Sequence, residues 1–118
     1  MEDEKIIQEI QYIKKMLKPD NLLYSNDIIK DISRLRRRLL KLIELVQQKY
    51  LSSQGYMHLL KRLSIAMYYV DIVYEMVLRN NSDEVRIFAS SFLSIAQGHI
   101  KLAELELEEQ MSKNTRNL

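Results

Sequence analysis

The chain has 118 residues, of which 47% are hydrophobic and 29% charged, a length and balance typical of one folded domain. Two Gly and one Pro are too few for many short strands, and the lack of Cys excludes disulfides, thiolate metal sites and cysteine nucleophiles. The net charge of +2 is unevenly distributed: residues 1–62 hold 13 Lys and Arg against 8 Asp and Glu (+5), and residues 63–118 hold 5 against 8 (−3). We therefore expect one all-α domain over residues 1–118 with a basic N-terminal half.

The N-terminal segment MEDEKIIQEI begins acidic and becomes amphipathic, unlike the basic start and apolar centre of a signal peptide. It predicts a cytoplasmic or virion-internal protein.

Apolar residues then recur at steps of four, three and four, which predicts a helix over residues 3–17 that ends before Pro19. These residues are Ile6, Ile10, Ile13 and Leu17.

The segment 27–50 carries the clearest helical pattern, a 4-3-4-3-4 repeat typical of a coiled-coil seam. Its members are Ile28, Ile32, Leu35, Leu39, Leu42 and Val46. Ser25, Asn26 and Asp27 precede it, and their short side chains are suited to accept hydrogen bonds from the free amides of a first helical turn.

A third helix is predicted over residues 53–79, with Ser52 and Ser53 as caps and Gly55 at the reversal of the chain. It is apolar around most of its circumference, and its centre line comprises Leu59, Leu63, Ala66, Val70, Val73 and Val77. The apolar run is shorter than the ~18 residues of a membrane span and contains Asp71 and Glu75, which predicts a central helix and no membrane contact.

A fourth helix is predicted from the cap Asn81 or Ser82 to about residue 110, with a frayed tail over 110–118. Small residues repeat every seven positions beside larger apolar ones, which predicts a buried face that permits close helix packing. This face comprises Ala89, Ala96 and Ala103 with Val85, Phe88, Phe92 and Ile100. Short connections favour antiparallel neighbours, so we expect a four-helix up-down-up-down bundle with a short first helix and three long helices.

Catalytic and metal-binding signatures are absent from the sequence. It has no Gly-rich phosphate loop or His-Glu-x-x-His motif, and neither His58 nor His99 follows a glutamate at the spacing of a di-iron bundle, so no cofactor or metal is expected. Asp71 and Glu75 would suit acid–base chemistry if buried together, but Arg79 lies four residues after Glu75, as in a solvent-side ion pair. We expect these carboxylates and His99 to be structural and the protein not to be an enzyme.

A basic ridge is the strongest functional feature. Lys30, Arg34, Arg37 and Lys41 are spaced by four, three and four residues, opposite the apolar seam of segment 27–50, and Arg36 and Arg38 flank them. Such a ridge is suited to contact phosphates of DNA or RNA, or an acidic protein. The alternative is the ordinary solvated face of an amphipathic helix.

One flank of the third helix is the second feature: Leu60, Met67, Tyr74 and Leu78 are apolar or aromatic and lie beside the centre line. We refer to these four residues as the apolar flank. Tyr and Met are common at interfaces, so the flank is a candidate contact with another chain, either a second copy or a different protein. Burial inside the monomer is the competing interpretation.

In size, all-α character and basic second helix, the chain resembles small helical accessory subunits of nucleic-acid-processing assemblies, viral and archaeal ones included. The resemblance is one of shape and composition, and it implies no residue roles. The first hypothesis is a non-catalytic interaction protein that docks another chain and contacts nucleic acid or an acidic partner through the ridge. The second is a structural or regulatory protein-binding bundle, a homo-oligomer without nucleic-acid contact. The third is an enzyme built on Asp71, Glu75 and His99.

Overall fold

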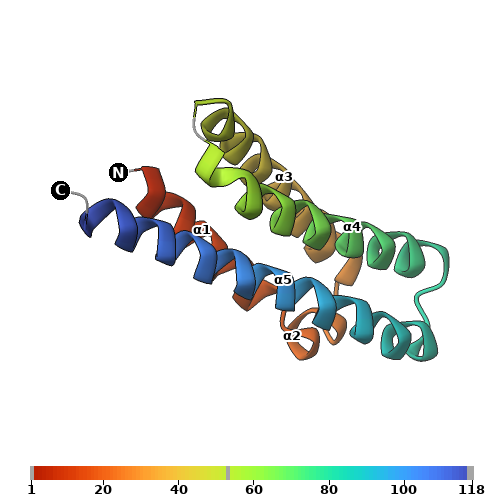
Figure 1. The fold of residues 1–118 in the computed structure, drawn as a ribbon. Helices are drawn as coiled ribbons and strands as arrows, with labels where there is room; N and C mark the ends of the chain where they lie inside the picture. Colours follow the sequence, from red (N-terminus) through yellow and green to blue (C-terminus); the bar gives the residue numbers. More distant parts are fainter. Residues whose placement is uncertain (1, 53, 117–118) are drawn as a thin grey trace.

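The structure, a computed structural model, describes residues 2–52 and 54–116, and the side chains of 3–49 and 55–113. Within these ranges the chain forms helices and no strand, which confirms the all-α prediction. There are five α-helices and one short 3-10 helix in the described chain (Figure 1). They are α1 (Glu2–Met16), α2 (Pro19–Leu23), α3 (Ile28–Ser52), η1 (Gln54–Tyr56), α4 (Met57–Arg79) and α5 (Asp83–Arg116).

Helix α3 begins where the sequence predicts. Asp27 accepts a hydrogen bond at Oδ1 from the backbone N–H of Lys30 (3.2 Å), so it caps the first turn as expected. All six residues of the predicted seam are buried, as are the four apolar residues predicted to line α1. The apolar spacing of these two helices therefore identified their core-facing sides.

Helix α2 was not predicted. Helix α1 ends at Met16, before Pro19, as predicted. Pro19 is the first residue of a separate five-residue helix, a position where the N–H that proline lacks would have no partner within the helix. This helix buries Leu22 and Leu23 and packs against both α3 and α5. Arg86 of α5 donates from Nη1 to the carbonyl of Leu23 (3.0 Å), which fixes the short helix at one end of the fold.

Helix α4 starts later than predicted, at Met57. Ser52 belongs to the end of α3, so it does not cap α4, and the predicted cap Ser53 lies outside the described residues. The turn η1 occupies the reversal, and its last residue, Tyr56, precedes α4 without a side-chain capping bond. The six centre-line residues of α4 are all buried, and the helix ends at Arg79 as predicted.

Helix α5 is the longest element, with 34 residues or about 51 Å, and it runs nearly the full 53 Å length of the molecule. Ser82 Oγ accepts from the N–H of Val85 (3.3 Å), which confirms the predicted cap. The alanines at 89, 96 and 103 are fully buried, but Phe88, predicted beside them, is 70% exposed. The helix also continues past residue 110 to Arg116.

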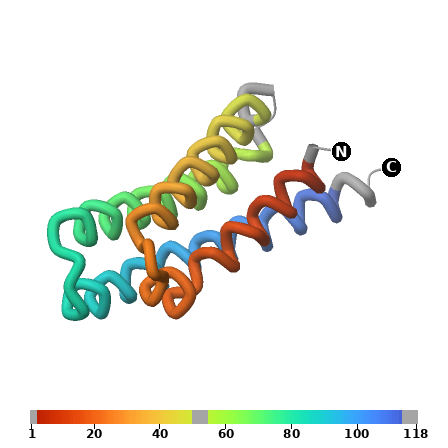
Figure 2. Tube along the Cα trace, turned by 180° about the vertical axis from the view of Figure 1, so that it is seen from behind, coloured from red at the N-terminus to blue at the C-terminus, as the bar shows by residue number. Residues whose placement is uncertain are grey.

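The helices form an elongated body in which α4 packs between α3 and α5. Helix α1 packs against α5 and, less extensively, against α3 (Figure 2). Helices α3 and α5 therefore lie on opposite sides of the helix pair α1 and α4. The N-terminal end of α1 and the C-terminal end of α5 lie together at one end (Figure 1). Helix α2 contacts both α3 and α5 beyond the end of α1. It therefore covers part of the core that α1 is too short to reach.

Tyr56 ties the reversal between α3 and α4 to α1. Its hydroxyl donates to the carboxylate of Asp3 at 2.8 Å (Oδ1) and 3.0 Å (Oδ2), and Lys49 Nζ lies 3.0 Å from Oδ1 of the same group. Burial of the phenol, and then its hydrogen bond to Asp3, raise the pKa of Tyr56 above the ordinary value of 10.0.

We expect Tyr56→Phe to lower the free energy of unfolding at neutral pH. The variant should also lose less stability than the wild type as the pH rises above 10. At pH 7 the variant lacks a hydrogen bond to a carboxylate, which costs about 1–2 kcal/mol. The raised pKa stabilises the fold below pH 10, and this contribution is lost as pH rises through the folded-state pKa, because the unfolded tyrosine ionises first. Urea unfolding at pH 7, 9, 10 and 11 measures both effects. Equal alkaline losses in the two proteins would contradict the assignment.

Candidate nucleic-acid interface

The basic ridge of Lys30, Arg34, Arg37 and Lys41 is exposed on the outer side of α3. Within the described residues, none of these four side chains forms an ion pair or hydrogen bond. All five other arginines with described side chains do have partners: each contacts an oxygen of another residue. They are Arg36, Arg38, Arg62, Arg79 and Arg86. The ridge therefore holds two arginines, Arg34 and Arg37, whose charge is not matched within this part of the fold.

Arg36, predicted to flank the ridge, points instead toward α4. Its Nε lies 2.7 Å from Oδ1 of Asp71, and its guanidinium lies 4.2 Å from the centre of the Tyr74 ring. The ion pair and the cation–π contact both join α3 to α4. Arg36 is thus occupied by a helix–helix contact, and it contributes less to the ridge than its place in the sequence indicates.

Arg38 occupies the opposite flank and joins α3 to α1. It donates from Nε and Nη2 to the two carboxylate oxygens of Glu9, at 2.8 and 2.9 Å, a bidentate pair. This hydrogen bonding raises the pKa of Arg38 above its ordinary value, and the guanidinium also lies 3.9 Å from the centre of the Tyr12 ring. The two flanking arginines therefore hold neighbouring helices in place on either side of the ridge.

A groove of about 450 Å³ lies between α1 and α3, beside the ridge. Its lining comprises Lys5, Glu9, Arg38, Lys41, Leu42 and Leu45. Because Glu9 is paired with Arg38, Lys5 and Lys41 leave the groove with excess positive charge. Tyr12, 45% exposed on α1, also lies next to this region through its contact with Arg38.

Lys5 and Tyr12 were not predicted to lie beside the basic ridge. Both lie on α1, 25 and 18 residues before Lys30, and nothing in the local sequence marks them as neighbours of the ridge. The ion pair between Glu9 and Arg38 brings them to the side of α3. The candidate interface therefore comprises surfaces of two helices, although the sequence pattern that predicts it lies on one.

The three residues considered for catalysis each contact a different basic side chain. Asp71 pairs with Arg36 of α3, and Glu75 pairs with Arg79 across 3.9 Å on the exposed side of α4, which confirms that predicted ion pair. His99 Nδ1 lies 3.4 Å from Nη1 of Arg62, which also pairs with Glu106. None of these contacts joins one of the three residues to another.

The apolar flank of α4 is divided between core and surface. Leu60, Met67 and Tyr74 are partly buried and pack against the core, whereas Leu78, near the end of α4, is 50% exposed. Much of this flank is thus covered by the chain itself.

Among the described residues, no group of three or more His, Cys, Asp or Glu side chains is placed to hold a metal ion. None of the helices in these same ranges is long and apolar enough to cross a membrane.

Comparisons with protein-family models, curated proteins and solved structures found no match to this chain.

Proposed function

We propose that this chain is a non-catalytic accessory protein that binds the phosphate backbone of nucleic acid through the basic ridge and docks another protein chain. In this proposal α1, α3, α4 and α5 form an up-down-up-down bundle, and α3 presents the ridge to the ligand. The apolar flank, above all the exposed Leu78, is a candidate contact for the second protein.

The observation that carries the proposal is the contrast between Arg34 and Arg37 on one side and Arg36 and Arg38 on the other. The second pair forms contacts within the fold at 2.7–2.9 Å, whereas the first pair has no partner in the described part of the chain. Unpaired arginines in a row repel one another, and an anionic ligand relieves this repulsion. The 12 residues from Lys30 to Lys41 span about 16 Å along the helix, enough for two or three phosphates.

Binding should be salt-dependent and nearly independent of base sequence, because the expected contacts reach phosphates. With two or three phosphates neutralised, the logarithm of the association constant should fall against the logarithm of salt concentration with a slope of about −2 to −3. A titration of fluorescent DNA and RNA oligonucleotides, single-stranded and duplex, from 50 to 200 mM salt measures this slope. Over this fourfold rise in salt concentration, the expected slope corresponds to about a 16- to 64-fold loss of affinity.

The competing hypothesis is a protein-binding bundle without nucleic-acid contact. An acidic protein on the ridge would also bind in a salt-dependent way, but it predicts no affinity for free oligonucleotides. Failure of the wild-type chain to bind any oligonucleotide at 50 mM salt would therefore reject the nucleic-acid role.

A further inference from the structure

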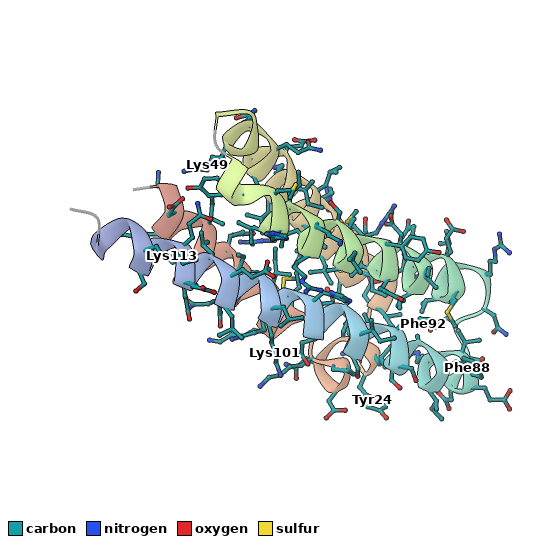
Figure 3. All side chains as sticks on the ribbon, in the orientation of Figure 1. Tyr24, Lys49, Phe88, Phe92, Lys101 and Lys113 are labelled. Atoms are coloured by element: carbon teal, nitrogen blue, oxygen red, sulfur yellow. The ribbon has the colours of Figure 1, made fainter. Side chains whose placement is uncertain are left out.

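Helix α5 has a second apolar side that the fold leaves uncovered. Its buried side faces α4 and α1, and the opposite side, which we call the α5 outer face, consists of exposed residues. The members of this face are Ile87, Phe88, Ser91, Ser94, Ile95, Gly98, Leu102 and Leu105. In Figure 3, Phe92 lies between α4 and α5, whereas Lys101, beside the outer face, points away from α4. An ordinary surface helix has one apolar stripe, so the second requires an explanation.

The exposed apolar area is large for a monomer. Ile87, Phe88 and Leu105 are 68%, 70% and 58% exposed, and Ile95 and Leu102 are 41% and 40% exposed. These five side chains expose roughly 600 Å², which approaches the ~800 Å² per partner that a standard protein–protein interface buries. That area is at the upper end of the largest apolar patches on ordinary monomers, and patches of this size are often functional.

Gly98 lies in the middle of this face, and the monomer does not require a glycine there. Its φ is not positive, and a Cβ added at this position would meet nothing within 4 Å. Gly55 differs, because its added Cβ would lie 2.7 Å from Nε2 of Gln110. A glycine inside a helix destabilises it relative to alanine, so Gly98 is explained if a backbone from outside the chain approaches it closely.

The arrangement of large and small residues is nearly symmetric about the middle of the face. Ile87 and Phe88 form one large apolar end, Leu102 and Leu105 form the other, and Ser91, Ser94, Ile95 and Gly98 lie between them. The ends are about 27 Å apart along the helix. A helix of the same sequence laid antiparallel on this face would place large ends against large ends, with Ser94, Ile95 and Gly98 at the crossing. This is the self-complementarity that a two-fold interface requires.

We propose that the α5 outer face binds the same face of a second copy of this chain, antiparallel, to form a two-fold homodimer. A hollow of about 520 Å³ adjoins the N-terminal end of the face and is lined in part by Leu23, Tyr24 and Ile87. In the antiparallel arrangement the Leu102 and Leu105 end of the second copy reaches this hollow. The proposal does not depend on nucleic-acid binding, because the ridge lies on α3, across the fold from α5.

Sedimentation equilibrium from 1 µM to 1 mM tests the proposal, with an expected approach to twice the chain mass of 14.1 kDa. Gly98→Gln should raise the dimer dissociation constant at least tenfold, because a side chain then separates the helices. It should not lower the melting temperature at monomeric concentrations, since glutamine is the better helix former. Leu40→Gln is the matched control: Leu40 is 48% exposed on α3, and its change should leave the dissociation constant unaltered.

A second measurement locates the interface directly. The chain has no cysteine, and Ser94 lies close to the proposed two-fold axis, so Ser94→Cys should form a disulfide with its own copy in a glutathione buffer. Ser64→Cys, at an exposed serine of α4, should not. A single-chain mass at every concentration would overturn the proposal. So would a dimer that Gly98→Gln leaves unchanged, or equal crosslinking of the two cysteine variants.

Discussion

Leu35→Ala should lower the free energy of unfolding by about 2–5 kcal/mol, because Leu35 is fully buried in the middle of the α3 seam. The substitution removes buried apolar surface and leaves a cavity that the neighbouring helices fill only in part. A domain of this size has a total stability of about 5–15 kcal/mol, so the loss is a large share of it. Urea unfolding followed by circular dichroism at 222 nm measures the difference.

Leu40→Ala provides a matched control for this experiment. The same two residue types are exchanged five positions further along the same helix, where the leucine is 48% exposed. Its cost should stay below about 1 kcal/mol, since exposed positions contribute little. Similar losses for both variants would mean that the assigned buried side of α3 is wrong.

Arg34→Gln combined with Arg37→Gln should make nucleic-acid binding much less sensitive to salt. Each lost phosphate contact reduces the slope of the logarithmic salt plot by about 0.7–0.9, so the double variant should lose about 1.5. Between 50 and 200 mM salt its affinity should then fall only about two- to eightfold. Glutamine preserves helix propensity, and both positions are exposed, so the fold should remain intact.

The control for this variant removes the same charge from another surface. Lys61→Gln combined with Arg79→Gln takes two exposed cations from α4, where Arg79 faces solvent beside Glu75. If the ridge is the binding surface, this control should keep a slope close to that of the wild type. Equal slopes for the two double variants would show that binding follows net charge, and the ridge would lose its assigned role.

The long helices were predictable because their apolar residues repeat over many turns. The seam of α3 and the centre line of α4 each contain six residues, and all twelve are buried. The short elements were missed for a corresponding reason: α2 has five residues and η1 has three, too few for a period to show. Phe88 was misplaced because one residue turns the helix by about 100°, which moves it from the buried row of Ala89 to the edge of the outer face.

The candidate interface was predictable only along one helix. The exposed positions of Lys30, Arg34, Arg37 and Lys41 follow from their spacing against the α3 seam. The partners of the two flanking arginines do not, because Asp71 and Glu9 lie 35 and 29 residues away in the chain. Spacing within a helix fixes which side a residue occupies, but tertiary contacts decide whether its charge remains available.

The pairing of α1 with the C-terminal half of α5 affects how the chain folds during synthesis. Lys14 and Glu104, which form an ion pair at 2.9 Å, are separated by 90 residues. At about 5–20 residues per second, translation leaves α1 without this partner for roughly 5–20 s. Helices α3 and α4 become neighbours after a short reversal, so we expect them to pair first, because closing a short loop costs less entropy. The ribosome-bound intermediate should then hold a paired α3 and α4 beside an α1 whose apolar side still awaits α5.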